Sequence, residues 1–190
     1  MKTFDGRFYV CENTNVKCVN PNDGIATNFK VFDKRIYLAG PVMNNSDWQG
    51  ELSKELIRLN QDDIHATLIC NPRREDVYNF EYQICWEQTH LQNCNIIFFY
   101  IPLSNNKKIK DMSEKIIYEL SEMINTNKYK NPSNNIIIAM HPDHPMYEYF
   151  KERRLRMENI EKKNVSFLKK TVFESENTIE QIAKLIMGVE

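Results

Sequence analysis

A short apolar run that ends abruptly constrains the fold of this chain more than any other feature. Ile36 to Ala39 is rich in strand-forming residues, and Gly40-Pro41 ends the run. From Asp47 onward the apolar residues follow helical spacing, with Trp48, Leu52, Leu56 and Leu59. A buried strand, a loop and a helix in this order are the typical start of an α/β sheet.

The same pattern recurs along the rest of the chain. Further apolar runs of strand length lie at 66–70, 95–101, 135–140 and 165–168. Stretches with helical spacing separate or follow them, at about 80–91, 111–125, 147–162 and 177–187. Unbroken apolar strands that alternate with helices predict an α/β fold, with a five-stranded parallel sheet covered by helices on both faces.

The first 33 residues predict a separate small element. Phe8–Cys11 and Val16–Val19 are strand-like runs joined by a polar segment, and Pro21–Gly24 has the composition of a turn. This arrangement is typical of a β-hairpin. We therefore expect an N-terminal hairpin extension over residues 1–33 and one α/β domain over residues 34–190, without an internal repeat or a linker.

Composition excludes several classes of partner. The 25 Lys and Arg residues nearly balance the 26 Asp and Glu residues of this 190-residue chain, which argues against general affinity for nucleic acid or anionic membranes. No apolar run is long enough to span a bilayer, and the N-terminus lacks the apolar core of a secretory signal. The five cysteines form no CxxC pair, and Cys70, Cys85 and Cys94 sit in apolar contexts. We expect buried free thiols and a reducing, cytoplasmic location.

Polar residues gather where the predicted strands end. Ligands of open α/β sheets bind beyond the carboxyl ends of the strands, so the clusters at 40–48, 71–76, 104–119 and 141–143 are candidate site segments. Two carboxylates lie instead beside apolar residues on predicted helices: Glu87 follows Cys85-Trp86, and Glu119 lies between Tyr118 and Leu120. Such a side chain either points into a pocket or lies on the helix surface beside the apolar stripe.

Several common sites have no support in the sequence. Gly40 belongs neither to a GxGxxG motif nor to a Walker loop, so dinucleotide and triphosphate binding are not indicated. No nucleophile elbow is present. His141 and His144 fit loop residues better than metal ligands.

Five short motifs occur together in one order: Tyr37–Pro41, Asp47-Trp48, Asn71–Arg74, Trp86-Glu87 and Tyr118–Leu120. In order and approximate spacing they resemble the nucleoside 2-deoxyribosyltransferase family. The resemblance covers about residues 34–187 and leaves the predicted hairpin outside it.

The resemblance implies a fold and a set of roles. It implies a Rossmann-like, flavodoxin-type sheet and a homodimer or larger homo-oligomer. Glu119 matches the family's nucleophile, Glu87 matches the acidic residue that contacts the base, and Tyr37 matches the aromatic residue near the sugar. A Ser or Asp before the nucleophile matches Ser113 or Asp111. The other motif residues are candidates for substrate binding: Gly40, Pro41, Asp47, Trp48, Asn71, Arg73, Arg74 and Trp86.

The chemistry of the implied reaction agrees with a pair of carboxylates. Cleavage of an N-glycosidic bond passes through an oxocarbenium-like state, which one carboxylate traps at C1′ while an acid helps the base to leave. No metal or cofactor is needed. We expect apolar Trp86 and Cys85 to desolvate Glu87.

The sequence leaves three functions open. The first is transfer of deoxyribose from a nucleoside to a second base. The second is hydrolysis of a nucleoside 5′-monophosphate or a related N-glycoside, because Arg73 and Arg74 suit phosphate unless they pair with nearby acids. The third is a catalytically silent nucleotide-binding module, which two departures from the family favour: Ser121 in place of Gly, and Asn95 in place of Asp.

Overall fold

Six parallel strands form one sheet. The computed structural model describes residues 16–26, 28–41, 47–61, 65–73, 79–125, 135–159, 165–168 and 176–188. The strand order is β1-β3-β2-β4-β5-β6, and every pair of neighbours is parallel. The strands are β1 (Val16–Val19), β2 (Lys34–Ala39), β3 (Thr67–Cys70), β4 (Ile96–Ile101), β5 (Asn135–Met140) and β6 (Val165–Leu168). The predicted parallel α/β sheet is confirmed.

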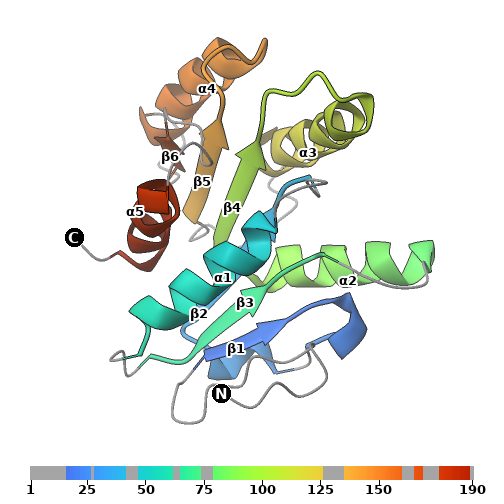
Figure 1. Ribbon diagram of the computed structural model, residues 1–190, viewed down its shortest axis with the longest axis vertical. Coiled ribbons are helices and arrows are strands. Elements are labelled where there is room, and N and C mark those ends of the chain that lie inside the picture. The colour runs from blue at the N-terminus through green and yellow to red at the C-terminus, as the bar shows by residue number, and fades with distance from the viewer. Residues whose placement is uncertain are drawn as a thin grey trace.

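In the described parts of the chain, five α-helices cover the two faces of this sheet (Figure 1). They are α1 (Trp48–Leu59), α2 (Phe80–Asn93), α3 (Lys107–Asn125), α4 (Tyr147–Asn159) and α5 (Glu176–Met187). α1 packs against α5 on one face, where their apolar residues meet Ile36, Leu38 and Phe98 of the sheet. Apolar residues of α2, α3 and α4 meet the alternate residues of the same strands on the other face. Both faces are therefore buried, as the unbroken apolar runs predicted. Among the described residues, no helix is long and apolar enough to cross a membrane.

The strand order has a switch point between β2 and β4. From β2 the chain adds β3 on one side, and it then returns to add β4, β5 and β6 on the other. Without β1, this is the flavodoxin-like order, in which the ligand site lies at the carboxyl ends of the two strands that flank the switch point. The expectation of a flavodoxin-type sheet is confirmed.

The first strand changes the expected role of the N-terminal residues. Val16–Val19 pairs with β3 as an edge strand, and Val16, Cys18 and Val19 are buried. The sheet thus has six strands where the sequence predicted five, and part of the segment predicted as a separate extension belongs to it. Phe8–Cys11, the other arm of the predicted hairpin, lies outside the described residues, so the hairpin stays a prediction.

Two further local expectations are corrected. α3 begins at Lys107, four residues earlier than predicted, because the Asn106 side chain accepts hydrogen bonds from the backbone N–H groups of Lys108 and Ile109. Cys85 is exposed, whereas Cys70 and Cys94 are buried with their Sγ atoms 3.7 Å apart. The apolar neighbours of Cys85 in the sequence lie on other faces of α2.

Candidate active site

The motif that follows β2 builds the connection to α1. Gly40 has no room for a side chain, because an added Cβ atom would collide with the indole of Trp48. The Trp48 indole N–H donates a 2.9 Å hydrogen bond to the carbonyl oxygen of Pro41, and its side chain is fully buried. Gly40, Pro41 and Trp48 therefore fix the path of the chain where β2 ends.

Arg73 joins the segment after β3 to this connection. Its guanidinium lies 2.6 Å from Oδ1 of Asp47, and the same oxygen caps α1 by accepting the N–H of Gly50. The backbone N–H of Arg73 donates a 2.9 Å hydrogen bond to Oδ1 of Asn71. Three predicted site residues thus form one network at the mouth of the site, in which the Arg73 guanidinium is paired with a carboxylate.

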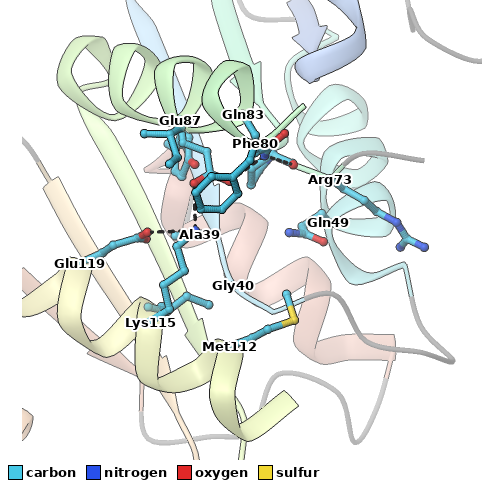
Figure 2. A pocket seen from close by; sticks show the side chains of 14 residues that line it. Ala39, Gly40, Gln49, Arg73, Phe80, Gln83, Glu87, Met112, Lys115 and Glu119 are labelled. Atoms are coloured by element: carbon cyan, nitrogen blue, oxygen red, sulfur yellow. Dashed lines mark hydrogen bonds and ion pairs between the residues drawn. The ribbon is translucent and has the colours of Figure 1, made fainter. Parts of the chain in front are cut away.

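A cavity of about 260 Å³ opens at the switch point of the sheet (Figure 2). This volume is just below the range of roughly 300–1,000 Å³ typical of small-molecule pockets, which suits a compact ligand. The end of β2, the segment after β3 and helices α1, α2 and α3 contribute its walls. Its lining residues are Tyr37, Ala39, Gly40, Gln49, Pro72, Arg73, Phe80, Gln83, Ile84, Glu87, Met112, Lys115, Ile116 and Glu119.

A chain of charged groups crosses this cavity from α2 to α3. Nζ of Lys115 lies 3.2 Å from Oε2 of Glu87 and 3.5 Å from Oε1 of Glu119. The other oxygen of Glu87 accepts a 2.6 Å hydrogen bond from Nε2 of Gln83. Figure 2 shows Lys115 between the two carboxylates, with Gln49 and Arg73 on the opposite side of the cavity. One ammonium group therefore forms ion pairs with two carboxylates that come from different helices.

The two carboxylate charges raise the pKa values of Lys115 and Tyr37. Burial disfavours the Lys115 ammonium, but the Glu87 and Glu119 charges outweigh burial and raise its pKa above the usual value. Burial, together with the same two carboxylate charges, raises the pKa of Tyr37 well above its usual range. Lys115 therefore stays charged near neutral pH, and the Tyr37 hydroxyl stays protonated and able to donate a hydrogen bond.

Two acceptor atoms of the cavity-lining residues have no hydrogen-bond partner. They are Oε1 of Gln49 and Oε1 of Gln83, and both are closed off from solvent. Gln49 is only 1% exposed. Buried polar atoms in proteins are nearly always hydrogen-bonded, so two such acceptors in the walls of one cavity call for a physical explanation.

The structure brings five of the predicted site residues into the cavity: Tyr37, Gly40, Arg73, Glu87 and Glu119. The remaining predicted residues that the structure describes do not line it. Trp86 is fully buried and donates its indole N–H to the carbonyl oxygen of Gly24. Buried Ser113 donates its hydroxyl to the carbonyl oxygen of Ile109 within α3. Arg74 lies outside the described residues.

The expected desolvation of Glu87 by Cys85 is wrong. Cys85 is exposed, and Trp86 packs beneath α2, where its ring stacks on His90 at a centroid distance of 3.8 Å. Glu87 contacts polar groups instead, namely the Gln83 amide and the Lys115 ammonium. Neighbours in sequence point in different directions on a helix, and those four residues apart share a face.

Sequence reasoning missed most of the residues around the two carboxylates. Lys115 and Gln83 each lie four residues before a predicted site glutamate, and that helical spacing was the available signal. Gln49, Phe80 and Met112 also line the cavity, and no pattern in the sequence marked them. Within the described part of the chain, no three His, Cys, Asp or Glu side chains group in a way that would hold a metal ion.

Comparison with known families gives a match over the same region. Residues 33–130 match the family described as nucleoside 2-deoxyribosyltransferase like. No significant match was found among curated proteins. The matched region contains the switch point of the sheet and every residue that lines the cavity.

Proposed function

The chain belongs to the nucleoside 2-deoxyribosyltransferase-like family, and from this premise we propose that it cleaves the N-glycosidic bond of a 2′-deoxynucleoside and transfers the sugar to another base. The observation that carries the proposal is the position of Glu87 and Glu119 in one cavity, both in contact with the same ammonium group. Paired carboxylates are what retaining glycoside chemistry requires.

In this mechanism Glu119 is the nucleophile. A carboxylate oxygen of Glu119 forms a bond to C1′ while the C1′–N bond breaks, and the base leaves with the electron pair and takes a proton from solvent through Glu87. A nitrogen of the second base then attacks C1′ as its N–H proton returns to solvent through Glu87, and the electron pair of the C1′–O bond goes back to Glu119. The covalent intermediate divides one difficult displacement into two easier ones. Glu87, across the cavity on α2, contacts the departing base.

Lys115 and Tyr37 supply charge and a hydrogen bond. Without substrate, the Lys115 ammonium partly neutralises the two carboxylates that it contacts. The sugar develops positive charge at C1′ in the transition state, next to the same carboxylates. The ammonium therefore occupies the region that a cationic sugar favours, and it has to give way when substrate enters. The protonated Tyr37 hydroxyl is available to the sugar or to Glu119.

The proposal is tested with Glu119→Gln. This variant keeps the shape of the side chain and removes its nucleophilic charge, so turnover of 2′-deoxynucleosides with a second base should fall at least ~10³-fold. Products are separated by liquid chromatography, and circular dichroism checks the fold. Glu114→Gln, an exposed position on the same helix, is the matched control and should keep full activity.

A second measurement traps the intermediate. The wild-type enzyme is mixed with a 2′-deoxynucleoside, denatured and digested, and mass spectrometry should find deoxyribose on the peptide that contains Glu119. A fully active Glu119→Gln enzyme would exclude the covalent mechanism.

A second function, hydrolysis of a nucleoside 5′-monophosphate, has one observation in its favour. A shallow depression open to solvent beside this cavity is lined by Lys107, Lys108, Asp111, Met112 and Lys115, and it shares Met112 and Lys115 with the cavity. Ammonium groups suit a phosphate, whereas Arg73 is already paired with Asp47. Release of free base from monophosphates without an acceptor base, weakened in Lys107→Met and Lys108→Met, would favour the hydrolase.

A further inference from the structure

Gln83 presents one unfilled hydrogen-bond acceptor, and the orientation of its amide is fixed. Its Nε2 donates to Oε1 of Glu87 at 2.6 Å and to the carbonyl oxygen of Pro72 at 3.1 Å. Both partners can only accept when Glu87 is ionised, so the amide cannot be turned around without losing two hydrogen bonds. Oε1 is thus the atom that lacks a partner.

The position of Gln83 connects this acceptor to the departing base. Phe80, Gln83, Ile84 and Glu87 follow the helical spacing of one face of α2, and all four line the cavity. If Glu87 contacts the base, as the proposed function holds, Gln83 lies one turn away on the same wall. An edge of the base can then reach both side chains.

Among the residues that the structure describes, none donates a hydrogen bond to Oε1 of Gln83. Oε1 of Gln49 is a second buried acceptor without a partner, and the cationic groups of Lys115 and Arg73 are held by carboxylates. A ligand that carries N–H groups would satisfy what the protein leaves unsatisfied. A ligand that presents a carbonyl oxygen to Gln83 would place two acceptors against each other.

Access to Oε1 requires the wall of the cavity to open, because this atom is closed to solvent. Phe80 is one turn before Gln83 on the same wall of the cavity and is 58% exposed. Its ring also offers a flat apolar surface on which a base can stack. A stacked base would point its polar edge along the helix toward Gln83.

We propose that Gln83 reads the leaving base by accepting a hydrogen bond from an exocyclic amino group, so that the preferred substrates are nucleosides of amino-bearing bases such as adenine and cytosine. This inference rests on the proposed function and specifies its substrate class. An amino group donates where the corresponding oxo base accepts. Sites built around such a hydrogen bond discriminate strongly against analogues that cannot form it.

Two pairs of substrates test the proposal. Deoxyadenosine is compared with deoxyinosine, and deoxycytidine with deoxyuridine, because each pair exchanges an amino group for an oxo group with little change in size. We expect kcat/KM to favour the amino member by roughly 10–100-fold in the wild type. Gln83→Met, which has similar length and no acceptor amide, should bring this ratio close to one.

The ratio separates recognition from general catalysis. Gln83→Met also removes a donor from Glu87, so both members of a pair will lose activity, but only loss of recognition changes their ratio. Gln88→Met, an exposed position on the same helix, is the matched control and should keep the wild-type ratio. A wild-type ratio near one, or an unchanged ratio in Gln83→Met, would overturn the proposal.

Binding of free bases gives a readout that does not depend on turnover. Isothermal titration calorimetry should show that the wild type binds adenine more tightly than hypoxanthine, and cytosine more tightly than uracil. Gln83→Met should bind the two members of each pair equally well. Selective binding without turnover would sustain the inference and refute the proposed function. Turnover without selectivity would support the proposed function and refute the inference about Gln83. Neither turnover nor binding of any base would refute both.

Discussion

At the scale of single residues, Lys115 distinguishes this site from a simple pair of carboxylates. Its ammonium contacts Glu87 on α2 and Glu119 on its own helix, although its side chain is 59% exposed. Without it, two carboxylates would face each other across one cavity with no counter-charge between them. We therefore regard Lys115 as a positioning residue that holds both carboxylates in place before substrate binds.

Replacement of Lys115 by Met tests this role through the pH dependence of activity. Without the ammonium, repulsion between the carboxylates favours protonation of one of them. The acidic limb of the kcat/KM profile should therefore move to higher pH. Lys110→Met, an exposed lysine on the same helix, is the control and should leave the limb in place. An unmoved limb in Lys115→Met would show that the ammonium does not control the pair.

At the scale of elements, α2 is held from its far side by the segment that follows β1. Trp86 donates its indole N–H to the carbonyl oxygen of Gly24, and the backbone N–H of Ala26 donates a 3.3 Å hydrogen bond to Nε2 of His90. Since Nε2 accepts, Nδ1 carries the proton and donates to the carbonyl oxygen of Trp86 at 2.7 Å. The helix that carries Gln83 and Glu87 is thus fastened by a neutral, fully buried histidine.

The burial of His90 predicts that the protein loses stability in mild acid. Burial lowers the pKa of His90 despite its hydrogen bond to Trp86. In the unfolded chain His90 binds a proton below about pH 6.5, whereas in the folded protein it does so only at lower pH. The free energy of unfolding should fall as the pH drops from about 6.5 through the lowered pKa, by up to ~1.4 kcal/mol per unit of depression. Urea titrations between about pH 5 and pH 7 measure this slope.

A substitution assigns this slope to one side chain. His90→Gln cannot take up the proton, so its stability should depend less on pH in that window than the stability of the wild type. Burial also lowers the pKa of His144, which contributes equally in both proteins. An identical slope in His90→Gln and the wild type would contradict the assignment.

At the scale of the whole molecule, the sheet was predictable because its strands are unbroken apolar runs. Because both faces of the sheet are buried, each strand is an apolar run. The ends of these runs indicated the carboxyl ends of the strands, where the cavity opens. Glu87 and Glu119 were singled out because each lies beside apolar residues on a predicted helix, and their roles were assigned from the resemblance to the family. Lys115 and Gln83 were missed because a polar residue on a helix has the same sequence pattern whether it faces solvent or a cavity. The homo-oligomer, the cytoplasmic location and the silent binding module stay predictions.

β1 was misjudged for a different reason. Four residues with one polar position fit an arm of a hairpin as well as an edge strand, and the β3 partner lies about 50 residues later in the chain, as the pairing of Val16 with Thr67 shows. Pairing between such distant segments leaves no local signal. The consequence reaches the site, because the carbonyl oxygen of Val19 accepts the N–H of Asn71, whose side chain in turn holds the backbone of Arg73.

Val19→Thr tests whether β1 is an integral part of the sheet. Threonine keeps the shape and strand preference of valine but buries a hydroxyl group without an assured partner, which should lower the free energy of unfolding by about 1–3 kcal/mol. Lys17→Thr makes the same residue at the exposed position of the strand and should change stability by less than ~0.5 kcal/mol. The midpoints of urea unfolding of both variants measure the difference. If Val19→Thr is as stable as Lys17→Thr, β1 is a loosely attached extension. If only Val19→Thr loses stability, the edge strand stabilises the sheet and supports the segment that carries Arg73.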